Sequence, residues 1–517
     1  MLFNSYEFIF AFLPLCLCGY FLCARVLSME FAFAFLVLAS LFFYAWWEPI
    51  YVLLILFSIG FNFGVGQLLA REGASRAVLV FGIATNLGLL GYFKYANFFI
   101  DNVNVAFGTE WNIGHIFLPL AISFFTFQQI AYLVDAWQDK ASEYNFLHYC
   151  LFVCFFPQLI AGPIVHHKEM LPQFMRSENL TPRLSNFAVG ISIFAIGLFK
   201  KTVLADSLSG YVGPIFDDET AAAEVDFFRA WGAALAYTFQ LYFDFSGYSD
   251  MAVGAARMFG VRLPINFFSP LKSTSIIEAW RRWHMTLSRF LREYLYIALG
   301  GNRKGKARRY INLFLTMLLG GLWHGAGWPF VIWGALHGSY LMINHGWRTL
   351  MDRLGLDLSG NRVYLLACWL ITFIAWVFSF VYFRAPTLEQ GQYIVTAMLG
   401  LSGFEVPAGI LVRAGSIGEW AMGMGVTAVQ GGGGVLMWNY LWVLAVAPIA
   451  LLLPNVAQIF HRYDPVLYEN DRIFAGQRQA GLLSFDYRTG WAFVVAAAGV
   501  AGVMTLQQVS EFLYFQF

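Results

Sequence analysis

The sequence predicts an all-α protein that crosses a membrane many times, and three observations lead to this prediction. Hydrophobic residues make up 59% of the 517 residues. Charged residues make up only 12%, whereas a soluble domain has about 25%. The mean hydropathy is +0.61. Such a chain cannot hide its apolar surface from water, so we expect that surface to lie in lipid, where a helix satisfies its own backbone groups.

The apolar runs predict where the membrane helices lie. A helix needs about 20 mostly apolar residues to cross a bilayer. The candidate spans are 8–24, 31–47, 50–70, 77–93, 115–136, 146–165, 187–207, 229–254, 309–323, 328–346, 362–383, 437–459 and 489–509. Several are short or polar, so we expect about 11 full spans, with re-entrant or half-length helices among the rest. The segments 161–163 and 244–247 are predicted breaks that line a cavity, because irregular backbone at membrane depth is tolerated only inside protein.

Basic residues predict the orientation of the chain. Arg25 ends the first span, Arg71 and Arg76 flank the turn after the third, and Lys140 follows the fifth. Because Lys and Arg collect on the cytoplasmic side, this alternation places the N-terminus outside. Residues 1–10 contain no Lys or Arg, so they lack the basic region of a signal peptide, and we expect the first apolar run to remain a membrane helix.

The segment 262–309, which we call the basic block, holds the largest group of basic residues. They are Arg262, Lys272, Arg281, Arg282, Arg289, Arg292, Arg303, Lys304, Lys306, Arg308 and Arg309. By the same rule the block lies in the cytoplasm. It is either an orientation signal alone or also attracts an anionic ligand, such as a phosphorylated carrier or coenzyme. We expect no nucleic-acid partner.

Two later segments do not resemble membrane helices. Residues 386–436 are rich in glycine, and residues 461–488 mix acidic and basic side chains. We expect the first segment outside and the second inside. The six cysteines fall in apolar segments and are predicted to be buried hydrophobic residues rather than disulfide partners. No His/Cys cluster has the spacing of a metal site, so none is predicted.

His324 is the first candidate catalytic residue. It ends an apolar run, and no charged residue lies between Arg309 and Arg348. An imidazole at that depth is either bound by a hidden partner or moves a proton. His284 is the second candidate, in the segment 275–297, whose apolar residues recur at helical spacing.

We interpret 275–297 as one amphipathic helix at the membrane interface, with His284 on its apolar side. A packed histidine bonded to a carbonyl is the alternative for His284. Two such histidines favour acid–base chemistry at a membrane face.

Two further polar groups are candidates for supporting roles. Asp244 and Asp250 lie in an apolar stretch and must pair with something: a histidine, an arginine of the basic block, or a purely structural network. The turn 300–305 combines glycines with basic residues, which can hold a phosphate through backbone amides and cations. It is not the pattern of a nucleotide P-loop. His337 is interpreted as structural.

Ordered motifs along the chain resemble the membrane-bound O-acyltransferases, in particular their bacterial polysaccharide branch of the alginate O-acetyltransferase type. The motifs are FFYAWW at 42–47, GYFKYAN at 91–97, PQLIAGP at 157–163, YFDFSGYSD at 242–250, WRRWHMTLS at 280–288, LREYLY at 291–296, LGGNRKG at 299–305 and GGLWHG at 320–325. The resemblance covers residues 1–385, which we expect to form the acyltransferase core. Residues 386–517 would add the Gly-rich loop, further membrane helices and the polar loop.

The resemblance implies a fold and a set of site residues. The fold is a ring of about 11 transmembrane helices around short or re-entrant helices, with a tunnel through the membrane. His324 matches the family's essential histidine. His284 matches a second position that is Asn, Asp or His among relatives. The predicted donor-binding residues are Arg282, Asn302, Arg303 and Lys304, and the predicted supporting network is Asp244, Asp250, Trp283 and Trp323.

The implied activity is transfer of an acyl group, most simply acetyl, from a cytoplasmic thioester to an extracytoplasmic polysaccharide such as alginate. The donor would be acetyl-CoA, no cofactor would stay bound, and a periplasmic SGNH-type acetyltransferase would be a partner. The expected location is the inner membrane of a bacterium. Alternatives are D-alanyl or other acyl transfer from a carrier protein, acetylation of peptidoglycan or cellulose, and a proton-coupled transporter that uses His324 and Asp250.

Overall fold

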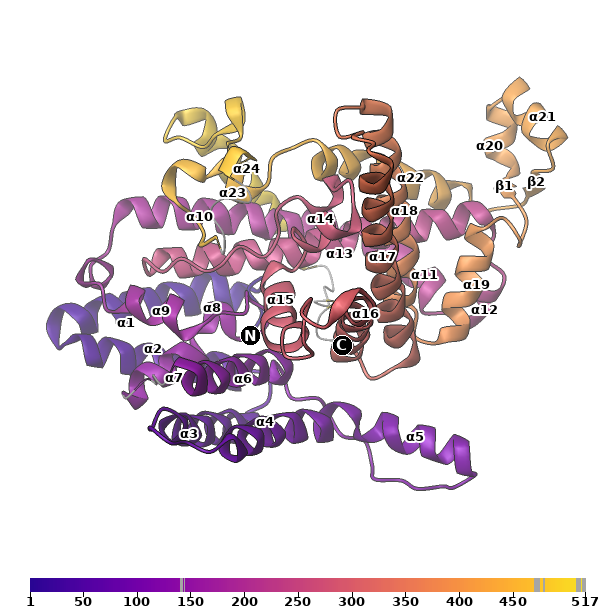
Figure 1. Ribbon diagram of the computed structural model, residues 1–517. Helices are drawn as coiled ribbons and strands as arrows, with labels where there is room; N and C mark the ends of the chain where they lie inside the picture. The colour runs from indigo at the N-terminus through magenta and orange to yellow at the C-terminus, as the bar shows by residue number, and fades with distance from the viewer. Residues whose placement is uncertain (140–142, 144, 469–474, 478, 508–512, 514–517) are drawn as a thin grey trace.

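The computed structural model describes residues 1–139, 143, 145–468, 475–477, 479–507 and 513. Lys140, one of the residues behind the predicted orientation, lies outside them. The described chain is helical, apart from one pair of short parallel strands, β1 (Glu405–Pro407) and β2 (Thr427–Val429). Figure 1 shows these strands with α20 (Ala408–Arg413) and α21 (Ser416–Gly423) at the edge of the molecule.

Six helical stretches among the described residues are long and apolar enough to cross a membrane. They are Glu7–Val26, Tyr51–Leu69, Arg76–Phe107, Leu184–Phe216, Arg362–Arg384 and Gly433–Leu451, and the shorter apolar helices are Met29–Ala45 and Thr489–Met504. The multi-pass helical architecture is therefore confirmed. The number of about 11 spans and the tunnel stay predictions.

The first half of the chain forms stacked helical layers. Its elements are η1 (Glu7–Phe12), α1 (Leu13–Val26), α2 (Met29–Ala45), α3 (Tyr51–Leu69), α4 (Arg76–Leu90), η2 (Gly91–Tyr95), α5 (Ala96–Phe107), α6 (Ile122–Asp139), α7 (Phe146–Cys154), α8 (Phe156–Leu159), α9 (His167–Phe174), α10 (Leu184–Phe199), η4 (Lys200–Ala205), α11 (Asp206–Phe216), α12 (Glu219–Ala223) and α13 (Phe227–Met258). In Figure 1, α3 and α4 form a layer below α6 and α7.

The second half carries the candidate site. Its elements are α14 (Ile276–Trp280), α15 (Met285–Phe290), η6 (Leu291–Tyr296), α16 (Gly305–His324), α17 (Trp328–Leu354), α18 (Arg362–Arg384), α19 (Leu388–Met398), α22 (Gly433–Leu451), α23 (Val456–Ile459) and α24 (Thr489–Met504). Contacts of α22 with α13 and of α24 with α10 join the segment after residue 385 to the preceding helices.

The helix α13 is continuous, so the predicted break at 244–247 is wrong. Gly247 does not form the predicted turn. It allows α13 to pack closely against α10. A Cβ atom at Gly247 would lie 2.8 Å from the carbonyl oxygen of Gly197, and one at Gly254 would lie 2.6 Å from that of Gly190. The glycines let the backbones of α13 and α10 meet, as small residues do between membrane helices. The predicted break at 161–163 is present, because α8 ends at Leu159 and the chain stays non-helical to His166.

The single amphipathic helix predicted for 275–297 is also wrong. The helix stops at Trp280 and starts again at Met285, and the backbone of His284 between them has φ 41° and ψ 53°. The non-helical segment 266–268 explains the interruption. Phe268 N donates to Arg282 O at 2.9 Å and Met285 N donates to Asn266 O at 3.0 Å, so this segment competes with the helix for its backbone bonds.

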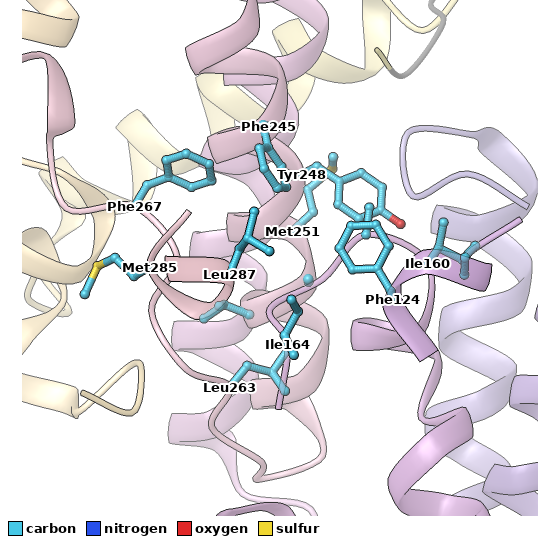
Figure 2. Packing of buried hydrophobic residues seen from close by; sticks show 14 of the residues in the cluster. Phe124, Ile160, Ile164, Phe245, Tyr248, Met251, Leu263, Phe267, Met285 and Leu287 are labelled. Carbon is cyan, nitrogen blue, oxygen red and sulfur yellow. The ribbon is translucent and has the colours of Figure 1, made fainter. Parts of the chain in front are cut away.

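A buried apolar cluster surrounds the start of α15. Figure 2 shows side chains that converge there from α6, the loop after α8, α13, the segment 263–267 and α15. The labelled members are Phe124, Ile160, Ile164, Phe245, Tyr248, Met251, Leu263, Phe267, Met285 and Leu287. Residues far apart in the sequence thus fix the place of the short helix α15.

Candidate active site

His324 is the last residue of α16 and is 4% exposed. Three aromatic rings surround its imidazole, with centroid distances of 4.9 Å to Trp323, 5.0 Å to Trp333 and 5.1 Å to Phe383. An apolar aromatic enclosure disfavours the charged imidazolium. The site therefore holds His324 in the neutral form that a general base requires.

The end of α16 is held by side chains from the GYFKYAN motif. The last carbonyl groups of a helix have no partner within it. Lys94 Nζ donates to the carbonyl oxygens of Trp323 and, at 2.9 Å, of His324, while Tyr95 Oη donates to Leu322 O at 2.6 Å. A cation at a helix C-terminus also complements the helix dipole, which contributes up to about 2 kcal/mol in a partly buried geometry. Lys94 and Tyr95 thus fix the residue that carries the imidazole.

The backbones of α16 and α17 meet at glycines just before His324. A Cβ atom at Gly321 would lie 2.3 Å from Phe330 O and 2.9 Å from the Cα atom of Gly334. One at Gly334 would lie 2.6 Å from Met317 O. Neither position has room for a larger side chain, so the two helices are in direct backbone contact beside the catalytic candidate.

His284 is fully buried and lies at the N-terminus of α15. A non-glycine residue with a left-handed backbone is uncommon, and a sparsely populated conformation costs on the order of 1–3 kcal/mol. Its Nδ1 atom lies 3.1 Å from Asn266 Oδ1, and its ring packs edge-on against Phe245 with centroids 4.8 Å apart. The structure therefore maintains a strained turn at this histidine.

Trp323 lies in contact with both histidines. Its ring centroid is 4.9 Å from that of His324 and 6.3 Å from that of His284. Phe127 stacks on the opposite side at 5.0 Å. The structure thus brings together His324, His284 and Trp323, three of the predicted site residues.

A cavity of about 330 Å³ lies beside these residues. Its lining consists of Ile277, Trp280, Arg281, Ser288, Leu291, Arg292, Tyr296, Asn302, Arg309, Leu313, Thr316, Met317, Leu341 and His345. The lining is basic at Arg281, Arg292 and Arg309. Its apolar wall at Trp280 touches Trp333, with centroids 5.8 Å apart, and Trp333 touches His324. One ring, that of Trp333, thus lies between the cavity wall and the imidazole of His324.

The four residues predicted to bind the donor lie in different places. Asn302 lines the cavity, whereas Arg303 and Lys304 are exposed on the neighbouring turn. Arg282 donates to Glu278 Oε1 at 2.7 Å and to Phe268 O at 3.2 Å, which ties the turn before His284 to the non-helical segment. The basic residues that line the cavity are Arg281, Arg292 and Arg309 of the same basic block, rather than the predicted Arg282, Arg303 and Lys304.

The predicted supporting residues form structural contacts. Lys201 binds Asp244 at 2.6 Å and Asp206 at 2.7 Å, and Lys200 binds Asp250 at 2.7 Å. The two candidate carboxylates therefore pair with lysines of η4.

Trp283 packs against Phe267, Trp376 and Phe380, with centroids 5.1, 5.2 and 5.4 Å away. His337 lies between Trp280 and Ser379, at 3.2 Å from the indole nitrogen and 3.0 Å from the hydroxyl oxygen. Its contacts fit the structural interpretation.

Sequence reasoning did not single out Lys94 and Asn266 as site residues. Lys94 carried a usable signal, because a single charged residue in a long apolar run is expensive unless it has a partner. Asn266 is the only amide in the apolar stretch 263–268, but nothing local indicates that His284 is its partner. Within the described ranges no group of three or more His, Cys, Asp or Glu residues could hold a metal ion.

Comparisons with known proteins identify the family of the chain. Residues 136–385, which contain both histidines, match the model of the membrane-bound O-acyltransferase family. A peptidoglycan O-acetyltransferase of Helicobacter pylori is 45% identical over 436 residues, 78% of this chain and 80% of that protein.

Two further relatives carry a different name. A probable alginate O-acetylase of Pseudomonas aeruginosa is 41% identical over 415 residues, 78% of this chain and 76% of that protein. One of Azotobacter vinelandii is 36% identical over 545 aligned positions that span both chains completely. With two candidate catalytic histidines inside the matched region and similarity over most of its length, the chain belongs to the membrane-bound O-acyltransferase family.

Proposed function

We propose that this enzyme transfers an acetyl group from acetyl-CoA, bound from the cytoplasm, to a hydroxyl group of a polymer outside the membrane. The observation that carries the proposal is the cavity with a basic lining whose apolar wall contacts the enclosure of His324. The cations suit the phosphates of a coenzyme, and the apolar wall suits the arm that carries the thioester.

His324 acts as the general base in this proposal. It takes the proton of the acceptor hydroxyl while that oxygen attacks the thioester carbonyl carbon. A C–O bond forms, the C–S bond breaks, and the departing thiolate takes the proton back from the imidazolium. The products are an acetyl ester and free CoA. A positioned base contributes about 10²- to 10⁴-fold, and holding both reactants in one site supplies much of the remaining acceleration.

The acceptor is either alginate or peptidoglycan, since the relatives carry both names. Transfer to the polymer is either direct or runs through a periplasmic SGNH-type acetyltransferase partner, whose hydroxyl group then receives the acetyl group first. Arg303, Lys304 and Asn302 attract the donor at the cavity edge, with Arg281, Arg292 and Arg309 in its lining. The protein acts in the inner membrane of a bacterium.

Oriented membrane vesicles test the donor and its side of entry. Inside-out and right-side-out vesicles receive radiolabelled acetyl-CoA, and ester-linked label is measured in each. We expect transfer in inside-out vesicles only, and none with His324→Ala. A D-alanyl carrier protein replaces acetyl-CoA in a parallel sample. Transfer from that carrier, with none from acetyl-CoA, would overturn the donor assignment.

Polymer analysis distinguishes the acceptors. Ester-bound acetate is measured on alginate and on peptidoglycan from strains with the wild-type and the His324→Ala protein. Omitting a co-expressed SGNH partner tests whether the acetyl group reaches the polymer directly. Loss of acetate from neither polymer would contradict a role in polymer modification.

A further inference from the structure

The side-chain amide of Asn266 faces the Nδ1 atom of His284. Thr286 shows which atom of the amide lies there. Its backbone N–H and its hydroxyl both lie near Asn266 Oδ1, at 3.4 and 3.0 Å. The hydroxyl oxygen of Thr286 in turn accepts from Ile164 N at 3.0 Å.

These contacts identify the chemical type of the Asn266 atom. A backbone N–H can only donate, so the Asn266 atom that faces Thr286 must be the carbonyl oxygen of the amide rather than its NH₂ group. The NH₂ group lies 3.5 Å from Ser249 Oγ. The same Oδ1 atom lies 3.1 Å from His284 Nδ1. An oxygen acceptor requires a donor, so Nδ1 carries the hydrogen.

We propose that Asn266 is a positioning residue that holds His284 in the Nδ1–H tautomer, so that Nε2 is the nitrogen with the lone pair. This inference rests on the proposed function for its catalytic meaning. A neutral imidazole with a bare Nε2 accepts a hydrogen bond there and cannot donate one. His284 then orients the acceptor hydroxyl by accepting its hydrogen bond, instead of donating to the thioester oxygen, and His324 remains the base.

The backbone around His284 supports the same role. Asn266 and Phe268 bracket the turn through their backbone bonds to Met285 and Arg282. The ring of Phe245 closes one side of the imidazole. A left-handed turn, a fully buried ring and a fixed amide together leave the imidazole one orientation. The bond between Ile164 and Thr286 joins the residue that follows the motif segment 157–163 to the motif segment 280–288.

Nitrogen NMR tests the tautomer without any substrate. Protein labelled with ¹⁵N-histidine is measured in lipid, and the His284 signals are assigned by their absence in His284→Asn. We expect a protonated Nδ1 and an unprotonated Nε2 in the wild type. We expect a mixture of tautomers, or the Nε2–H form, in Asn266→Leu, which keeps the size of the side chain but has no acceptor. A wild-type Nε2–H signal would overturn the proposal.

Kinetics then tests the catalytic consequence. Asn266→Leu should lower kcat by about 10²-fold, the scale of a lost acid–base contribution, while the KM for the donor changes less than threefold. Asn266→Asp keeps the acceptor oxygen, so it should retain more activity. Its negative charge favours the imidazolium, which should move the acid side of the pH profile to higher pH. Equal loss in both variants with unchanged pH profiles would reduce Asn266 to a structural residue.

A matched variant controls for packing. Asn439 is likewise buried, at 6% exposure, but lies in α22 against Gly232. Asn439→Leu should lower stability without changing the His284 signals. If no acetyl transfer occurs under any condition, the NMR result still decides the tautomer, so the failure of one proposal is distinguishable from the failure of the other.

Discussion

The surroundings of the two histidines differ in kind. His324 ends a 20-residue helix, lies among aromatic rings, and is fixed through the backbone carbonyls that Lys94 and Tyr95 bind. His284 begins a six-residue helix from a strained turn, and its ring itself is bound by Asn266. The long helix determines the burial of the His324 imidazole among aromatic rings. The turn determines the orientation and the tautomer of the His284 imidazole.

The largest expected effect is that of His324→Ala. It should abolish acyl transfer, because no other group in the enclosure can accept the hydroxyl proton. The bonds of Lys94 to the α16 carbonyls do not involve the imidazole, so membrane yield and thermal melting should stay close to wild type. Substantial polymer acylation in a strain with only this variant would show that His324 is not the base.

His284→Ala should lower turnover severely, and His284→Asn should retain part of it. Asparagine is one of the few non-glycine residues that adopt a left-handed backbone readily, so it keeps the turn, and its amide oxygen can accept a hydrogen bond. Turnover of the purified variants separates the two roles. Equal and complete loss would favour proton transfer at His284, and unchanged turnover would make it structural.

Lys94→Met tests the fixation of His324 through the helix end. We expect kcat to fall by about 10²-fold, since small misplacements of a catalytic group have effects of this size, with a smaller loss for Tyr95→Phe. Lys272→Met is the matched control, because Lys272 Nζ also donates to a backbone carbonyl, that of Leu453 at 2.6 Å, in another part of the chain. Similar losses at Lys94 and Lys272 would indicate general destabilisation.

Neutralising the basic residues should have a smaller effect, on donor binding. Variants of Arg303 and Lys304, and separately of Arg281 and Arg309, should raise the KM for acetyl-CoA more than they lower kcat, because a remote charge contact acts equally on ground and transition states. The effect should shrink with salt, which screens exposed charges over about 8 Å at physiological ionic strength. An unchanged KM at low salt would show that the basic block serves only as an orientation signal and does not bind the donor.

The smallest expected effect concerns the ion pair between α15 and α9. Arg289 binds Glu169 in two bonds, at 2.6 and 3.0 Å. Burial raises the pKa of the Glu169 carboxyl, whereas the hydrogen bonds and the charge of Arg289 lower it. The lowering is larger, so the pKa lies below its ordinary value. The pair therefore stabilises the fold above the pKa of an unfolded glutamate, and this contribution disappears as pH falls through the lowered one.

Glu169→Gln should consequently lower the melting temperature by a few degrees at pH 7. The difference from wild type should shrink in acid, where the wild-type carboxyl is protonated. Melting of both proteins at pH 7 and in acid measures this. A difference that is independent of pH would mean that packing, not charge, is lost.

The apolar runs predicted most of the helices, because length and composition determine what lipid accepts. The candidate spans around residues 8–24, 362–383 and 489–509 each correspond to a helix. The predictions of where helices continue or break were wrong at two places where a segment distant in the sequence packs against the helix. The helix at 275–297 is interrupted by backbone bonds from 266–268, and the break at 244–247 is absent because Gly247 fits against α10.

The residues of the candidate site likewise fall into those that the sequence predicted and those that only the structure identifies. His324, His284 and Trp323 follow from the motifs, and the structure brings them together. Lys94 lies 230 residues from His324 in the sequence, and Asn266 meets His284 from a non-helical segment. Such partners depend on tertiary contacts that no local pattern contains.

The glycine contact between α16 and α17 limits how reactants can enter and leave. Two helices whose backbones already touch at Gly321 and Gly334 cannot slide past each other by a residue without a clash, and they move only as one rigid pair. Of the three rings around His324, Trp323 and Trp333 belong to this pair, and Phe383 comes from a third helix, α18. Any widening of the enclosure therefore changes the distance between α18 and the pair, while His324 and Trp333 keep their spacing.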